Sequence, residues 1–520
     1  MEIYENKEDT CMFLNRQVLP AKKAFTACAG TACIEDDLFK IRKKKRDEIL
    51  HSKRQLQHPS TIVLGKKFER MYPMVYKLYS NDNNMQLEAA IAFSEVLKTG
   101  VRKPPIKEVA YLGVIPRFVE FLMREDFPEL QLPALEALIN ITWGTSEIVK
   151  AVVDNGAVPS LVKLLDSPSD DIREKAICAL GNIAADSLWS RDIVLDQGAL
   201  QPLLAQSHEH ARLSMLRTVA FTLSSLCSGT PPPTLAKIHT ALPALARFTN
   251  SSCHEILECA CHSLWNLAVK DHMIQPIIDA GVEYGLIQRL VQHIGHCCSS
   301  VRTPAIATVM NIVDRSPRQV QAIVDFGAFP LLLNVITNRY GTTNVEKEYS
   351  CWTVAHIASE NENRVQSVFE AGLIPPIVKL LRTSDVHNQV DLLKAVVVVI
   401  FHVTAKGSNE HVRYLADQGC IKPLCNLLVS TDPAMLLWTL EVLENMLNVG
   451  EVQRVLAEDD NYYADLILDS AVIGRLYALQ KHNDANVFSK AITIYKTYVQ
   501  VEGSKEAVEG TGDQLSKLQI

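Results

Sequence analysis

The chain has 520 residues, of which 48% are hydrophobic and 7% aromatic, and its formal net charge is -7. This weakly acidic balance argues against a nucleic-acid binder. The polar, acidic N-terminus does not read as a signal peptide, and the longest purely apolar run, residues 395–401, is too short to span a bilayer, so we expect a soluble intracellular protein without membrane insertion.

The first 65 residues do not follow the pattern of the rest of the chain, and they are predicted to form a separate, flexible N-terminal segment. Within it, a basic block begins at Arg42 and ends at Arg46, and the basic pair Lys53 and Arg54 follows. A basic run alone is weak evidence, because it is equally typical of a solvated helix start and of a localisation signal.

A recurring Gly-x-x-Pro phrase organises residues 66–500. It occurs at 113–116, 156–159, 327–330 and 372–375, with looser copies at 198–202 and 419–423. Neighbouring clear copies lie about 42 to 47 residues apart, the period of armadillo and HEAT repeats. Because Gly ends one helix and Pro opens the next, we predict an all-α solenoid of about ten repeats with one concave surface. Residues 501–520 are predicted to be a flexible tail.

An asparagine recurs near the end of the last helix of several repeats, at Asn140, Asn182, Asn266 and Asn311. Equivalent positions of a solenoid line up on one face, so these amides are expected to form a ladder. Two interpretations stay open. Each Asn bonds local backbone, or the ladder donates to and accepts from the backbone of an extended peptide.

The cysteines and histidines from Cys253 to His262 are grouped like metal ligands, but they fall mostly in one predicted helix without the spacing of a structural zinc site. They are interpreted as buried repeat residues, like the rest of the 13 cysteines. No phosphate loop, nucleophile elbow or catalytic carboxylate pair stands out. The sequence therefore predicts no metal, no cofactor and no enzymatic activity.

Residues 132–159 and 172–186 resemble the second and third repeats of importin alpha, the nuclear-import adaptor, and residues 478–487 resemble its C-terminal repeat. The resemblance implies a right-handed superhelical armadillo solenoid that shuttles between cytoplasm and nucleus. It also implies an adaptor that binds basic localisation signals of cargo in its groove and links them to importin beta. An export receptor and nuclear pore components are further implied partners.

The basic block is similar to the importin-beta-binding segment of that family. The family usually carries a second arginine-rich cluster upstream, but residues 33–37 are Cys-Ile-Glu-Asp-Asp here, so weaker importin-beta binding is expected. By the same resemblance, Lys53 and Arg54 occupy the adaptor's own groove when importin beta is absent. The resemblance assigns importin-beta binding to the basic residues Arg42, Lys43, Lys44, Lys45 and Arg46.

In that family, each inner helix carries Trp and Asn four residues apart, so that indoles stack on the stems of Lys and Arg. The asparagines of this chain match the pattern better than its aromatic positions do. For the major site the matching pairs are Glu136/Asn140, Cys178/Asn182 and Phe221/Ser225. The next repeat gives His262/Asn266, and the minor site has Trp352/His356 and Val398/His402, with Asn266 and Asn311 assigned to it as well.

The family pocket for the key lysine of a signal is matched by Gly144, Thr145 and Asp186, with Asp186 as the counter-charge. Val149 stands where the family has a threonine. Trp143 and Trp265 lie near the ladder, and two interpretations stay open. Either indole compensates for a lost aromatic slot, or Trp143 obstructs the groove.

The resemblance thus predicts a divergent import adaptor. Each missing aromatic slot is expected to remove about 1 to 3 kcal/mol of peptide affinity, so binding of ordinary basic signals is weakened or altered. His356 and His402 are interpreted as hydrogen-bonding substitutes for Asn, although titrating histidines would make cargo binding pH-sensitive. The alternatives are an armadillo scaffold of the signalling or adhesion type, and a paralogue that has lost ordinary cargo.

Overall fold

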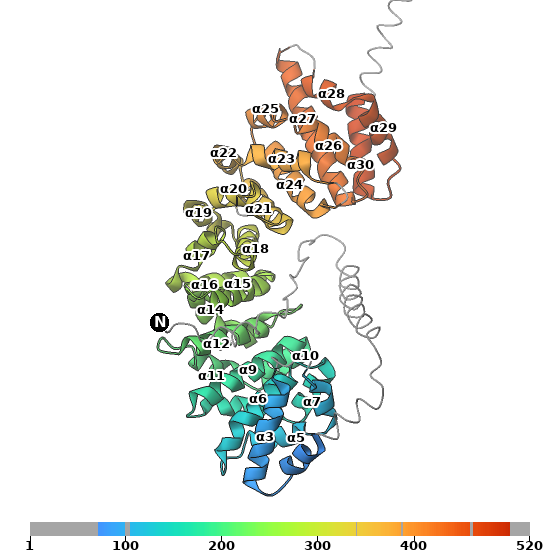
Figure 1. The fold of residues 1–520 in the computed structure, drawn as a ribbon. Helices are drawn as coiled ribbons and strands as arrows, with labels where there is room; N and C mark the ends of the chain where they lie inside the picture. Colours follow the sequence, from blue (N-terminus) through green and yellow to red (C-terminus); the bar gives the residue numbers. More distant parts are fainter. Residues whose placement is uncertain (1–70, 99–103, 340, 386–387, 458–460, 500–520) are drawn as a thin grey trace, which may run out of the picture. The chain divides into compact units, whose positions relative to one another are not determined.

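The computed structural model describes residues 71–98, 104–339, 341–385, 388–457 and 461–499, and the regular elements in these ranges are all helical (Figure 1). The predicted N-terminal segment, with its basic residues from Arg42 to Arg54, and the predicted C-terminal tail lie outside the described residues. The chain divides into two compact units, one ending at Pro202 and one beginning at Leu203. Each unit is described by itself.

The first unit has the helical pattern of armadillo repeats. The last helix of one repeat packs against the last helix of the next, so that α3 contacts α6 and α6 contacts α9. The helices of this unit, with α11 reaching past its end, are α3 Asn83–Leu97, α4 Ile106–Tyr111, α5 Ile115–Phe121, α6 Gln131–Ile141, α7 Ser146–Asp154, α8 Ala157–Lys163, α9 Asp170–Asp186, α10 Leu188–Asp196 and α11 Leu200–Ala205.

The second unit continues the same pattern, and its inner helices contact one another in sequence from α12 to α15, α18, α21, α24, α27 and α30. These inner helices are α12 Leu213–Cys227, α15 His254–Ala268, α18 Ser299–Arg315, α21 Asn344–Ala358, α24 Val390–Lys406, α27 Pro433–Ala457 and α30 Ala485–Ile494. The connecting helices are α13 Leu235–Ile238, α14 Leu242–Phe248, α16 Asp271–Gly281, α17 Leu286–His293, α19 Pro317–Asp325, α20 Ala328–Ile336, α22 Glu362–Glu370, α23 Ile374–Thr383, α25 Asn409–Asp417, α26 Ile421–Leu427, α28 Tyr462–Ile467 and α29 Ser470–Leu479.

The predicted glycine turns are confirmed by their backbone conformation. Gly156 and Gly327 precede α8 and α20 with φ of 81° and 85°, in the left-handed region that other residues avoid. The same conformation recurs at Gly113, Gly198, Gly372 and Gly419. Each glycine reverses the chain between the first and second helices of a repeat, so the phrase sets the repeat geometry.

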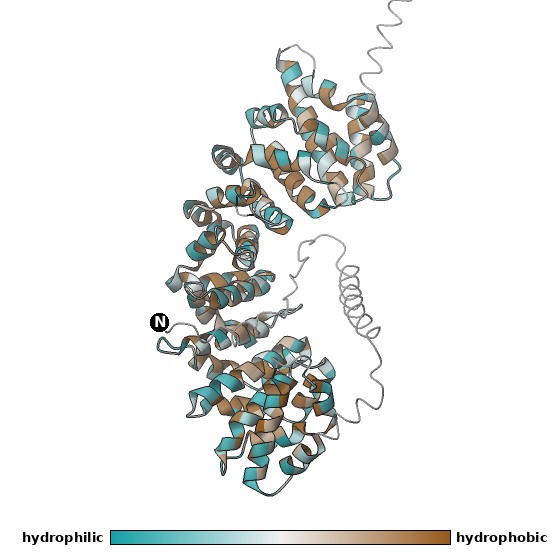
Figure 2. Cartoon of the chain, in the orientation of Figure 1, coloured by the Kyte–Doolittle hydropathy of each residue, from teal (hydrophilic) through white to brown (hydrophobic). Residues whose placement is uncertain are grey.

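The inner helices are buried along much of their length, because other helices of the array cover them. Residues 176–184 of α9 and 395–400 of α24 are all buried. The connecting helices carry both hydrophobic and hydrophilic residues (Figure 2). Within the described ranges no single helix is long and apolar enough to cross a membrane. Among the described helices, the pair α19 and α20, bent by 81°, meets the length and composition of a span when taken together.

One ion pair lies inside the second unit, between α18 and α21. Arg302 is 1% exposed and its Nε lies 2.9 Å from Oε1 of Glu346, which is 0% exposed. Ser299, Thr303 and the backbone of Thr343 donate further hydrogen bonds to the same carboxylate. Burial raises the pKa of Glu346, but the bonds from Arg302 and its neighbours lower the pKa more, so the group stays ionised.

We expect Gly327→Ala to lower the free energy of unfolding by about 1 kcal/mol. No atom lies within 4 Å of the added Cβ, so the effect comes only from the left-handed backbone. Gly474→Ala, also in open space but inside α29, is the matched control and should stabilise by about 0.5 to 1 kcal/mol. Denaturant unfolding of both variants checks this, and two shifts of the same sign would contradict it.

Candidate functional site

The two ladder asparagines of the first unit lie on its inner helices, α6 and α9. Nδ2 of Asn140 donates to the Glu136 carbonyl oxygen at 2.9 Å, and Nδ2 of Asn182 donates to Oγ1 of Thr142 at 3.2 Å. Asn182 is buried. Each bond uses one of the two donor hydrogens of a carboxamide. Asn140 thus bonds the preceding turn of its own helix, and Asn182 bonds the neighbouring repeat.

The second unit repeats this bond between neighbouring inner helices. Nδ2 of Asn266 lies 3.3 Å from Oγ of Ser228, and Nδ2 of Asn445 lies 3.2 Å from Oγ1 of Thr404. Asn311 is different, because its Oδ1 accepts from Arg315 at 3.0 Å. The sequence analysis missed Asn445, although it stands one repeat after His402 and belongs to the ladder.

Asp186 is the last residue of α9 and lies against the start of α7. Its Oδ1 accepts from Oγ of Ser146 at 3.0 Å, and Thr145 is the N-cap of α7. Gly144 has no room for a side chain, because an added Cβ would lie 2.9 Å from Ile148 and 3.0 Å from a backbone oxygen. The structure therefore brings the predicted pocket residues together, whereas Val149 is fully buried and does not line a pocket.

The aromatic positions of the first unit hold other side chains. Glu136 accepts from Oγ of Ser94 at 2.8 Å. Cys178 is buried, which raises the pKa of its thiol to about 12, and it offers no wall to a ligand. Trp143 is half-buried at the end of α6. Stacking slots are thus absent at the two predicted positions of this unit.

The remaining two major-site residues, Phe221 and Ser225, lie on α12 in the second unit. Ser225 is buried and its Oγ donates to the carbonyl oxygen of Phe221 at 3.1 Å, so it bonds its own helix as Asn140 does. The predicted major site is therefore divided between two units, each of which is described by itself.

An aromatic cluster surrounds the predicted minor site on α21. Trp352 stacks on His356, with ring centroids 5.9 Å apart and planes 26° apart, and meets Trp438 of α27 edge-on at 6.1 Å. The sequence analysis missed Trp438, although it lies two helical turns before Asn445. Val398 is buried on α24 and offers no aromatic surface.

Trp265 does not compensate for a lost slot. It is only 4% exposed and packs against His262 and Tyr349 in the interior, with ring centroids 5.9 and 6.3 Å away. An indole beside the ladder position points inward, because neighbouring residues of one helix do not share a face. Of the possibilities that the sequence left open, burial of Trp265 therefore argues against its use as an aromatic slot.

The histidines that the sequence analysis assigned to the groove are held neutral by burial. Burial lowers the pKa of His262 and of His402 to about 4. Burial also lowers the pKa of His356, although Asp314, 3.2 Å from its Nδ1, acts in the opposite direction. These side chains therefore carry no charge near neutral pH, which favours their interpretation as hydrogen-bonding groups over a pH switch in that range.

This burial gives a pH dependence of stability. Because the folded pKa of His402 lies below its ordinary value of 6.5, the unfolded chain binds the proton more readily, and stability falls as the pH drops from about 6.5 towards 4. We expect His402→Asn to reduce the stability lost between pH 7 and pH 5 by about 1 to 2 kcal/mol. Denaturant unfolding at both pH values measures it.

His210→Asn is the control, since His210 is exposed in the same unit. Its pH dependence should stay close to that of the unchanged chain. If His402→Asn lost as much stability on acidification as the unchanged chain, the buried neutral imidazole would not contribute.

Comparison with known proteins agrees with the repeat architecture. Residues 145–185 match the model of the Armadillo/beta-catenin-like repeat. The crystal structure of an engineered protein superposes with a TM-score of 0.67 at 25% identity, covering 80% of this chain and 96% of the other. These findings confirm the predicted all-α armadillo solenoid.

Curated relatives match most of the chain. Importin subunit alpha-1a of Oryza sativa subsp. japonica is 43% identical over 486 residues, 92% of this chain and 90% of that protein. Importin subunit alpha-1b of the same plant is 42% identical over 444 residues, 85% and 81% of the two chains. Importin subunit alpha-2 of Arabidopsis thaliana is 42% identical over 492 residues, 92% and 90%.

Proposed function

Because this chain belongs to the importin alpha family of nuclear-import adaptors, we propose that it binds basic localisation signals of cargo and links them to importin beta. The adaptor then crosses the nuclear pore, through contacts with pore components, and returns with an export receptor, so that it shuttles between cytoplasm and nucleus. The alignment with Importin subunit alpha-1a covers 92% of the chain at 43% identity. This similarity supports the adaptor proposal more than the scaffold alternative.

The single observation that carries cargo binding is the carboxylate of Asp186. It lies at the end of an inner helix, half-buried, with Oγ of Ser146 as a 3.0 Å donor and the turn at Gly144 beside it. A carboxylate held in place and partly shielded from water attracts a lysine ammonium more strongly than a fully solvated one. We assign to it the counter-charge of the signal's key lysine.

The groove amides support an extended peptide in the same place. Asn140 and Asn182 each commit one Nδ2 donor to the protein, and a carboxamide has a second donor and an acceptor for a ligand. In the second unit, Nδ1 of His402 has no hydrogen-bond partner among the described residues although it is buried. A buried polar atom without a hydrogen-bond partner costs free energy, so binding of a ligand that supplies this hydrogen bond is favourable.

The proposed adaptor differs from its relatives in its preference for cargo. The major-site positions Glu136 and Cys178 give no stacking surface, whereas Trp352 and Trp438 make an aromatic pair in the second unit. Lysine and arginine stems bind best against indole faces. We therefore propose that signals depend less on stacking in the first unit and more on the aromatic cluster around Trp352.

Asp186→Lys should weaken binding of a fluorescent basic signal peptide by at least about tenfold, or 1.4 kcal/mol, because a repelling ammonium replaces the counter-charge. The measurement uses full-length chain carrying Lys53→Ala and Arg54→Ala, so that these residues do not compete. Asp166→Lys makes the same charge change on an exposed residue of the first unit. Equal affinities for the two variants would overturn the pocket assignment.

Replacing Arg42, Lys43, Lys44, Lys45 and Arg46 by alanine should abolish binding of importin beta in a pull-down at fixed salt, because the ion pairs of the segment are lost. Signal-peptide binding should stay at least as strong, since these residues are not assigned to the groove. Retained importin-beta binding would overturn the assignment of these residues, whereas absence of importin-beta binding by the unchanged chain would favour the alternative of an armadillo scaffold.

A further inference from the structure

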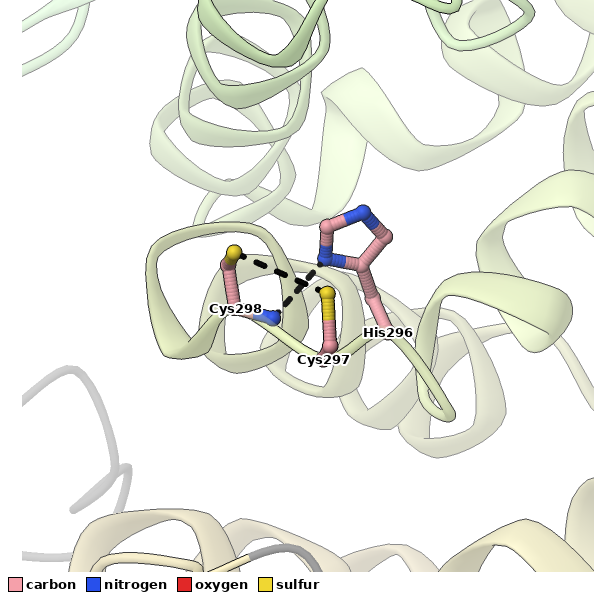
Figure 3. A group of neighbouring side chains, drawn as sticks. All are labelled: His296, Cys297 and Cys298. Atoms are coloured by element: carbon pink, nitrogen blue, oxygen red, sulfur yellow. Dashed lines mark hydrogen bonds between the residues drawn. The ribbon is translucent and has the colours of Figure 1, made fainter.

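The turn between α17 and α18 gathers His296, Cys297 and Cys298 (Figure 3). The imidazole and the two thiols each place one ligand atom within 4.8 Å of the others. In the sequence, the residues grouped like metal ligands are those at 253–262, and not this turn. There Cys259 and Cys261 are buried inside α15, so that group is not a site, whereas this turn is partly exposed.

The separation of the two sulfurs matches a zinc site. Sγ of Cys297 lies 3.7 Å from Sγ of Cys298. Zinc–sulfur bonds of about 2.3 Å at the tetrahedral angle place two thiolates about 3.8 Å apart. The sulfurs therefore already have the spacing that a shared Zn²⁺ requires, and two adjacent cysteines reach it without any change of the backbone.

The backbone of this turn is held by the buried Arg302. Its Nη1 donates to the carbonyl oxygen of His296 at 2.7 Å and to that of Cys297 at 3.2 Å. Arg302 is itself fixed by its ion pair with Glu346 in the interior. Ligands held by a second layer of hydrogen bonds bind a metal better than mobile ones, because less ordering is needed on binding.

The imidazole of His296 is oriented by two neighbours. Its ring stacks on His254 with centroids 5.9 Å apart and planes 12° apart, and His293 meets it edge-on at 6.2 Å. Nδ1 accepts the backbone N–H of Cys298 at 3.1 Å. That nitrogen therefore carries the lone pair that a metal ion needs, and binding of the ion would replace the hydrogen bond from Cys298.

We propose that His296, Cys297 and Cys298 form a zinc site, in which Nδ1 and two thiolates bind Zn²⁺ and water takes the fourth position. Both thiol protons pass to solvent on binding. Cys297 is exposed, so the fourth position stays open to water, as in zinc sites with three protein ligands. This inference is independent of cargo binding, and it departs from the absence of metal expected from the sequence.

The full-length chain, reduced and stripped with a chelator, is titrated with Zn²⁺ against a chromogenic zinc dye, and separately with Co²⁺. We expect one tightly bound ion that Cys297→Ser/Cys298→Ser removes, together with the thiolate-to-cobalt charge-transfer absorption. His296→Ala should weaken zinc binding at least about tenfold, as loss of an oriented ligand does. Unchanged binding in the double variant would overturn the proposal, as would absence of zinc binding by the unchanged chain.

Cys28→Ser/Cys33→Ser is the matched control, because it removes two cysteines outside the described residues. The control should keep the ion and the absorption, and their loss would place zinc elsewhere and contradict the proposal. Circular dichroism verifies folding. If the double variant unfolds, Cys297→Ser alone replaces it, since this exposed side chain can be changed without disturbing the interior.

Discussion

The burial of inner helices by one another is the constraint on which the rest of each unit depends. A single repeat cannot cover its own apolar surface. The buried residues of α9 and α24 are therefore shielded from water because other helices of the array pack against these two helices. This contact fixes the distance between neighbouring inner helices. Hydrogen bonds such as Asn182 to Thr142 and Asn445 to Thr404 then form at a similar place in different repeats.

The positions assigned to the groove are under a different constraint from the interior of the array. Interior side chains must fill a shared core, but positions that face a ligand contribute little to packing, and they can change without loss of the fold. Glu136 accepts a hydrogen bond from Ser94, and Cys178 is buried. In the second unit, the indoles of Trp352 and Trp438 contact each other edge-on.

The second unit also uses polar groups inside its array. Arg302 and Glu346 join two repeats through a fully buried ion pair, and the same guanidinium holds the carbonyl oxygens of the turn at His296 and Cys297. A buried charge is tolerated only when its hydrogen bonds are satisfied. The Arg302 side chain therefore both joins two repeats and fixes the backbone of the turn that carries Cys297 and Cys298.

The sequence alone determined the period, the glycine turns and the family, because these depend on local backbone conformation and on a pattern repeated along the chain. Gly156 and Gly327 stand at the predicted turns, in the left-handed conformation, and Asp186 accepts a hydrogen bond from Ser146, two residues after Gly144. Only the tertiary structure decided that Trp265 is internal, that Trp438 meets Trp352, and that the sulfurs of Cys297 and Cys298 lie beside the imidazole of His296. The reason is physical: the neighbours of Trp265 and Trp352 come from helices a repeat or more away, and the rotation of each helix in the packed array selects which face is buried. In the turn from His296 to Cys298, the side-chain directions depend on the backbone conformation of the turn, which Arg302 holds by hydrogen bonds.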